Sequence, residues 1–95
     1  MAGYIVVDIE ITDPNEYQTY AKQTAATIER YGGKFVVRGG EPETLEGDWK
    51  TKRLVIIEFP SIEQAKAWYN SPEYSAIIGI RHHSAISKML LVQGV

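Results

Sequence analysis

The sequence predicts an α+β fold in which the elements follow one another in the order β-α-β-β-α-β. Hydrophobic residues alternate with a period of two in four short segments, which is typical of strands with one buried face. After the first and third of these segments, hydrophobic residues recur at three- and four-residue steps, as in amphipathic helices. This order predicts a four-stranded antiparallel sheet with helices on one face and the first and third strands in its centre.

The first strand and the first helix have the clearest patterns. The first strand, Tyr4 to Ile11, has one uniformly apolar side and one mixed side that includes Tyr4, Val6, Asp8 and Glu10. Asp13 is then a typical N-cap, followed by Pro14 at the first helical position and Glu16 at the capping-box position. We expect this helix to end at Gly32-Gly33, since glycine commonly terminates helices.

Two further strands surround a long connection. The second strand, Lys34 to Arg38, is expected to place Phe35 and Val37 on one side and Val36 and Arg38 on the other. The connection from Gly39 to about Thr51 is longer than a tight hairpin requires, and ordered loops of this length are often functional. The third strand, Arg53 to Phe59, has an apolar side and a mixed side, which consists of Leu54, Ile56 and Glu58.

The last third of the chain adds a broken helix and a final strand. Ser61 is expected to cap a second helix, and Ser71-Pro72-Glu73 restarts a helix that extends to about His83. Ser87 to Val95 completes the sheet. With 95 residues, the chain is expected to form one ferredoxin-like domain over residues 1–95.

The composition disfavours several classes of function. A net charge of −2 without a basic cluster argues against nucleic acid and against a membrane surface as partners. The chain has no cysteine, which rules out disulfides, thiolate nucleophiles and iron–sulfur ligation. No signal peptide or membrane-spanning segment is recognisable, so we expect a cytoplasmic protein.

The second face of the predicted sheet favours a homodimer. If the more uniformly apolar sides pack on the helices, the other face still carries a set of large apolar side chains: Tyr4, Val6, Val36, Leu54, Ile56, Leu90 and Val92. At about 1.5–3 kcal/mol each, leaving these in water forgoes on the order of 10 kcal/mol. We expect a second copy to cover this face. A C-terminal segment folded back over the sheet is disfavoured, because the predicted last strand ends the sequence.

The same face also carries charged residues, which suggests a hydrated cavity between two facing sheets. Arg38 is the candidate to bind an anionic ligand there, and Glu58 or Asp8 is the candidate to move a proton. Repulsion between the two carboxylates would raise the pKa of one of them. The alternative is an ion-pair network that only stabilises the dimer.

Four other residues are candidate ligand-binding residues. Glu46 and Trp49 belong to the long connection, which is either a lid or a solvated excursion fixed by the tryptophan. Tyr74, at the helix break, is the tyrosine expected to reach the cavity, and Arg81 follows two helical turns later. Tyr17 and Tyr20 are interpreted as core residues.

No metal or other cofactor is expected. His82 and His83 are adjacent, so on a helix their side chains point about 100° apart and do not face one metal ion together. Histidines near a helix C-terminus also interact favourably with the helix dipole without any further role.

Several short motifs, in this order, resemble those of one family: Arg38-Gly39-Gly40, Leu45-Glu46-Gly47-Asp48-Trp49, Glu58-Phe59-Pro60-Ser61, Asn70-Ser71-Pro72-Glu73-Tyr74 and Val92-Gln93-Gly94-Val95. The chain is identified over nearly its whole length as a member of the domain-of-unknown-function 1330 family, within the dimeric α/β-barrel superfamily. The resemblance implies the fold and the dimer. Relatives in that superfamily include cofactor-free monooxygenases, polyketide cyclases, muconolactone isomerases and haem-degrading enzymes, but a shared fold does not transfer function.

The leading hypothesis is a cofactor-independent protein that binds, and as an enzyme converts, a small anionic or carbonyl-bearing organic molecule between the sheets. The alternatives are a ligand-binding or sensor module of the same fold without turnover, and a dimerisation domain without a ligand.

Overall fold

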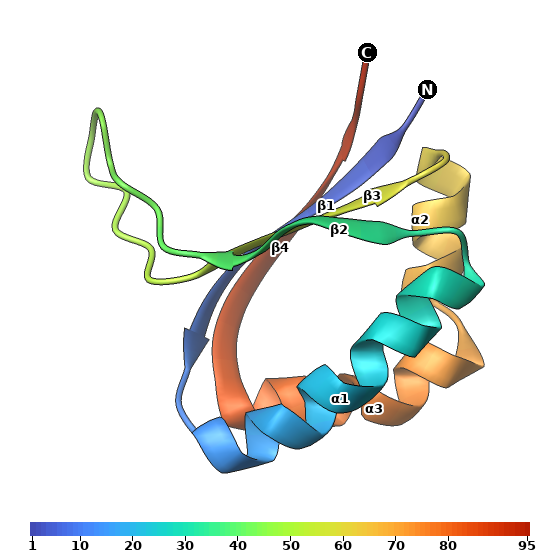
Figure 1. The fold of residues 1–95 in the computed structure, drawn as a ribbon, viewed down its shortest axis with the longest axis horizontal. Helices are drawn as coiled ribbons and strands as arrows, with labels where there is room; N and C mark the ends of the chain where they lie inside the picture. Colours follow the sequence, from blue (N-terminus) through green and yellow to red (C-terminus); the bar gives the residue numbers. More distant parts are fainter.

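The structure is a computed structural model that describes residues 1–95. Its elements, in chain order, are β1 (Gly3–Ile11), α1 (Pro14–Arg30), β2 (Lys34–Gly40), β3 (Leu54–Phe59), α2 (Ile62–Tyr69), α3 (Pro72–Ser84) and β4 (Ala85–Gln93). Figure 1 shows the helices on one face of the twisted sheet and the connection between β2 and β3 extending beyond the sheet. None of the helices has the length and apolar character needed to cross a membrane.

The sheet has the strand order β2-β3-β1-β4, and all neighbouring strands are antiparallel. The expectation that β1 and β3 form its centre is confirmed. In the register of the two central strands, Val7 pairs with Val55 and Val6 pairs with Ile56. Val7 and Val55 are buried under the helices, which fixes the face of every other residue in this pair of strands.

The helix starts follow the side-chain capping that the sequence predicts. The Asp13 carboxylate accepts a hydrogen bond from the Glu16 amide at 3.1 Å, and the Ser61 hydroxyl accepts one from the Gln64 amide at 3.1 Å. Ser71 caps α3 in the same way. The strand bounds differ slightly from expectation, because β2 continues to Gly40 and β4 begins at Ala85, directly after α3.

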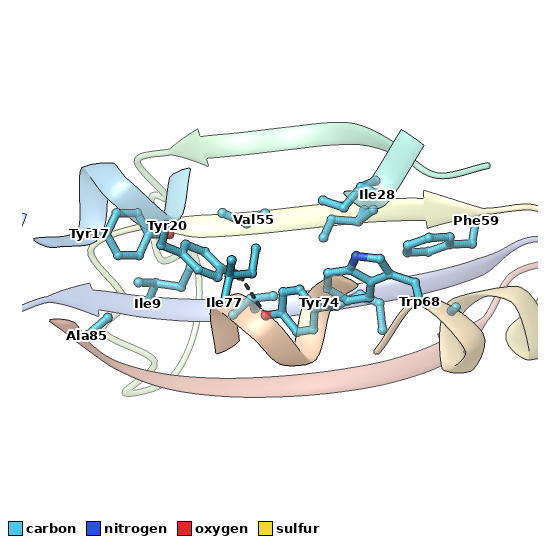
Figure 2. Close-up of a cluster of buried hydrophobic side chains, with 14 residues drawn as sticks. Ile9, Tyr17, Tyr20, Ile28, Val55, Phe59, Trp68, Tyr74, Ile77 and Ala85 are labelled. Atoms are coloured by element: carbon cyan, nitrogen blue, oxygen red, sulfur yellow. Dashed lines mark hydrogen bonds between the residues drawn. The ribbon is translucent and has the colours of Figure 1, made fainter. Parts of the chain in front are cut away.

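An aromatic cluster forms the centre of the core between the helices and the sheet (Figure 2). Trp68 and Tyr74 have no exposed surface, and their ring centroids lie 4.1 Å apart. Trp68 also packs on Phe59 and donates a hydrogen bond from Nε1 to the Thr27 hydroxyl at 3.0 Å. The cluster therefore joins α1, α2, α3 and the sheet in one packed unit.

The opposite face of the sheet has no covering element in the chain (Figure 1). Its large apolar side chains are exposed, most strongly Leu90 at 68% on β4, together with Val36, Ile86 and Val92. We call this surface the open face.

Two glycines should respond in opposite ways to replacement by alanine. At Gly33 an added Cβ would lie 2.6 Å from the Phe59 ring and 2.7 Å from Ile28, and both neighbours are fully buried. We expect Gly33→Ala to destabilise the protein by about 1–3 kcal/mol, as overpacking does. Gly79 lies on an exposed part of α3 with open space around it, so Gly79→Ala should stabilise by about 0.5–1 kcal/mol. Urea unfolding followed by circular dichroism measures both, and equal effects would contradict the packing described here.

Candidate functional site

Strand β2 does not keep the alternation that its sequence suggests. Its register shifts between Phe35 and Val37, so that Val37 pairs with Ile56 and Arg38 pairs with Val55. Paired residues on neighbouring strands share a face of the sheet, and Val55 lies on the helix-covered face. The expectation that Arg38 points to the open face is therefore wrong. The physical reason is a β-bulge, in which an extra residue in one strand reverses the sides of the residues that follow it.

The Arg38 side chain instead extends over a ring on the helix side of the sheet. Its guanidinium carbon lies 4.4 Å from the centre of the Phe35 ring, which is within the range of a cation–π contact. The residue as a whole is exposed, so Arg38 stands at the edge of the helix–sheet interface.

Arg81, in the last turn of α3, is the one charged residue among the buried residues of the chain, with 4% of its surface exposed. Its Nε donates a hydrogen bond to the Tyr74 hydroxyl at 3.2 Å, and its Nη1 donates to the Ser87 hydroxyl on β4. Its Nη2 lies 3.4 Å from Nε2 of His82. The Tyr74 hydroxyl is in turn 2.7 Å from that of Tyr20 on α1 (dashed in Figure 2). These contacts hold the guanidinium in one orientation.

The tyrosines around Arg81 remain neutral at physiological pH. Burial raises the pKa of Tyr17, an effect that the charge of Arg53 partly offsets. Burial, together with the neighbouring Tyr74, also raises the pKa of Tyr20. Burial alone would disfavour the charge on Arg81, but the phenols of Tyr74 and Tyr20 keep its pKa above the usual value, so the guanidinium is charged.

Arg53, just before β3, is a third arginine on this side of the sheet. Its guanidinium carbon lies 6.0 Å from the centre of the Tyr17 ring, and its Nε is buried without a hydrogen-bond partner. Gly39 makes room for it, because a Cβ at that position would lie 2.3 Å from the guanidinium carbon. Gly39 also has a φ of +78°, which disfavours any residue with a side chain.

The three arginines line a cavity of about 40 Å³ between the helices and the sheet. Ten of its 14 lining residues are hydrophobic, including Val7, Val55, Tyr17 and Trp68. The enclosed space suits one or a few water molecules. A larger ligand therefore needs a side chain at the edge to move, and exposed Arg38 is the one placed to do so.

The cavity has positive charge and no negative charge in its wall. No aspartate, glutamate or histidine lines it. The ion pairs of the chain lie elsewhere and join Arg30 to Glu73, Lys34 to Glu58, and His83 to Glu16. A buried cation without a counter-ion is costly, so a bound anion would be favoured at this place.

The two candidate catalytic carboxylates do not meet. In the pairing of β1 with β3, Asp8 lies opposite Leu54 and Glu58 lies opposite Tyr4. Four residue steps separate the two positions along the strands, or roughly 13 Å. The expected repulsion between two neighbouring carboxylates is therefore absent. Each carboxylate has a local partner, and that of Asp8 is the Thr51 hydroxyl.

Glu58 takes part in a small polar network on the open face. The Tyr4 hydroxyl donates to its Oε1 at 2.8 Å, and Lys34 Nζ lies 3.3 Å from its Oε2. The hydrogen bond from Tyr4, followed by that from Lys34, lowers the pKa of Glu58 below its usual 4.5. The expectation of a raised pKa in this pair is therefore wrong for Glu58. This network is the ion pairing that was the alternative to a catalytic role.

The connection between β2 and β3 places Trp49 away from the cavity. Trp49 is 61% exposed and lines a shallow hollow on the open face together with Val6, Leu54 and Leu90. Glu46 is exposed in the same connection. A ligand-binding role for Glu46 and Trp49 stays a prediction, and in this structure it concerns the open face.

Tyr74 does not face the open side of the sheet. Its side chain is fully buried beside Trp68 on the helix side (Figure 2). The expectation that Tyr74 reaches a cavity between two sheets is therefore wrong, because the restart of the helix at Pro72 turns this residue inward. Tyr17 and Tyr20 are core residues, as the sequence suggests.

The two histidines have different surroundings. His83 Nδ1 lies 4.0 Å from a carboxylate oxygen of Glu16 on α1, whereas His82 contacts Arg81. No three His, Asp or Glu side chains lie close enough together to hold a metal ion.

Arg53 is the residue of this cavity that the sequence reasoning missed. A signal existed, since Arg53 has the same parity as Val55 and Ile57 on the buried side of β3. Arg81 likewise follows Tyr74 and Ile77 at helical spacing and so belongs to the buried stripe of α3. Arg38 had no such signal, because the bulge that turns it is not visible in the alternation.

The fold and its relatives define the class of this protein. The topology is ferredoxin-like, with four antiparallel strands and helices on one face. The chain belongs to the family described as domain of unknown function DUF1330, whose profile matches residues 2–95. No curated protein matches the chain.

Solved structures share this fold at low sequence identity. A protein of unknown function from Rhodopseudomonas palustris, RPA0582, is 19% identical with a TM-score of 0.79, over 99% of this chain and 82% of that one. SnoaB, a cofactor-independent oxygenase from Streptomyces nogalater, is 15% identical with a TM-score of 0.66, over 99% and 93% of the two chains. A dimeric ferredoxin-like protein of unknown function from Jannaschia sp. CCS1 is 10% identical with a TM-score of 0.66, over 99% and 100%.

The Glu58 network predicts a pH-dependent contribution to stability. Because the pKa of Glu58 is lower in the folded protein, its contribution is present above the usual value of 4.5 and is lost as the pH falls through the folded value. The wild type should therefore lose more stability than Glu58→Gln between about pH 7 and pH 3. Urea unfolding of both proteins across this range measures the difference, and parallel curves would contradict the network.

Proposed function

We propose that each subunit binds a small organic anion in the cavity between its helices and its sheet. The observation that carries this proposal is Arg81, a buried guanidinium in an apolar cavity with no carboxylate partner. Apolar walls with a few convergent polar groups are the usual anatomy of a small-molecule site. The anion-binding role expected of Arg38 alone is thus shared by three arginines.

The three arginines have different parts in this proposal. Arg81 is fixed by Tyr74 and Ser87, so it supplies a preorganised anchor at the base of the cavity. Arg53 offers a buried Nε that has no partner. Arg38 is exposed and closes the cavity, so its outward movement admits the ligand and its return adds a charge contact.

Turnover of the bound molecule is the finer part of the proposal. SnoaB is a cofactor-independent oxygenase, and its likeness to this chain concerns the fold. Within the cavity of this protein, neither a carboxylate nor an imidazole is available to remove a proton. Glu58 and Asp8 lie on the other face of the sheet, so a catalytic role for them would require a second site there. A ligand-binding or sensor module uses the same cavity without turnover.

We also propose that the protein works as a homodimer through its open face, in the cytoplasm. Exposed Leu90, Val92, Ile86 and Val36 form an apolar surface that a second copy would cover. Lys88 and Asp8 lie opposite each other on this face, so a two-fold arrangement brings charges of both signs together. The dimeric state printed for the Jannaschia protein, which has this fold, supports the proposal.

Ligand charge should decide binding. Benzoate should bind more tightly than benzylamine, a cation of similar size, because only the anion compensates the arginines. Arg81→Met and Arg53→Met should each weaken benzoate binding by about tenfold or more, the value of a charged hydrogen bond. Arg30→Met is the matched control, since Arg30 lies on the exposed end of α1. Isothermal titration calorimetry measures these affinities, and equal binding of the two probes would refute the proposed function.

The dimer should be lost when charge enters the open face. The wild type should scatter light at about twice its 10.7 kDa chain mass. Leu90→Glu should give a folded monomer, because Leu90 is exposed in the isolated chain. Ser75→Glu, an exposed change on α3, should remain dimeric. Light scattering coupled to size-exclusion chromatography distinguishes the three proteins, and a monomeric wild type at micromolar concentration would contradict the dimer.

A further inference from the structure

The cavity holds positive charge that nothing in its wall balances. Three guanidinium groups line it, and none of them is part of an ion pair. Because most of the wall is hydrophobic, the charges act through a medium that screens them less than water does. Such surroundings favour the ionised form of any acidic group placed among them.

The donors of these arginines are already oriented. Arg81 is held at Nε by Tyr74 and at Nη1 by Ser87, which leaves further guanidinium hydrogens free to point into the cavity. Arg53 keeps a buried Nε–H without an acceptor. An oxyanion in the cavity would therefore meet fixed donors without first rearranging them.

The wall contains no group that would take a proton from a ligand. Tyr17 and Tyr20 are neutral phenols whose pKa values burial raises, and no carboxylate or imidazole lines the cavity. An acidic ligand that ionises on binding must therefore lose its proton to water.

Resting on the proposed function, we propose that the cavity selects acidic phenols and enols and binds them as phenolates or enolates. In this step the ligand O–H bond breaks, the oxygen keeps the electron pair, and the proton passes to solvent. The arginines lower the pKa of the ligand, and the apolar wall holds its planar body. The protein thus generates an electron-rich anion without a base of its own.

The test is the ionisation of p-nitrophenol, whose phenolate absorbs visible light. With protein in excess, a pH titration of absorbance should show the apparent pKa of the bound probe lowered by about 1, which equals tenfold tighter binding of the phenolate than of the phenol. Arg81→Met and Arg53→Met should each return the pKa toward its value in water. Arg30→Met should leave the lowered value unchanged. If Arg81→Met does not fold, the Arg53→Met protein decides the outcome.

The outcomes separate this inference from the proposed function. If benzoate binds but the pKa of p-nitrophenol is unchanged or raised in the complex, the inference fails and the anion site stands. If neither benzoate nor p-nitrophenol binds, both fail. A lowered pKa that persists in both Arg81→Met and Arg53→Met would also overturn the inference, because the effect would then come from elsewhere in the molecule.

Discussion

The register shift in β2 is the constraint on which the candidate site depends. It turns Arg38 from the open face to the helix side, where its guanidinium lies over Phe35. The second irregularity, between Arg38 and Gly40, brings Gly39 against the Arg53 side chain without a clash. A regular strand would have left one arginine on the wrong side and the other without space. The bulged edge strand thus assembles a cationic wall from two segments that the long connection separates in sequence.

Arg81 links this wall to the hydrophobic core. Its contacts run through Tyr74 to Tyr20 on α1 and through Ser87 to β4, so both helices and an edge strand fix its position. The aromatic packing of Trp68 against Tyr74 continues this support into α2. Burying a charge without a carboxylate costs stability that the packed core must offset. Such a cost is retained most readily at functional sites, where a ligand completes the interaction.

The two faces of the sheet divide the properties of the molecule. The helix side contains the arginine-lined cavity, and the open face contains the exposed apolar residues, the Glu58 network and Trp49. A ligand bound on the helix side and a second copy on the open face would therefore not compete for surface. They meet only through the strands themselves, because Leu54 on the open face is followed directly by Val55 in the cavity wall.

The order of the elements, the central place of β1 and β3, the helix caps and the apolar open face could be predicted from the sequence, because each follows from local periodicity or capping chemistry. The membership of Arg81 and Arg53 in the buried face was also present in the pattern, although the reasoning did not use it. The side that Arg38 faces, the separation of Asp8 from Glu58 and the inward turn of Tyr74 were decided only by the tertiary structure. A bulge and a strand register are settled by pairing between distant segments, and local alternation carries no information about either.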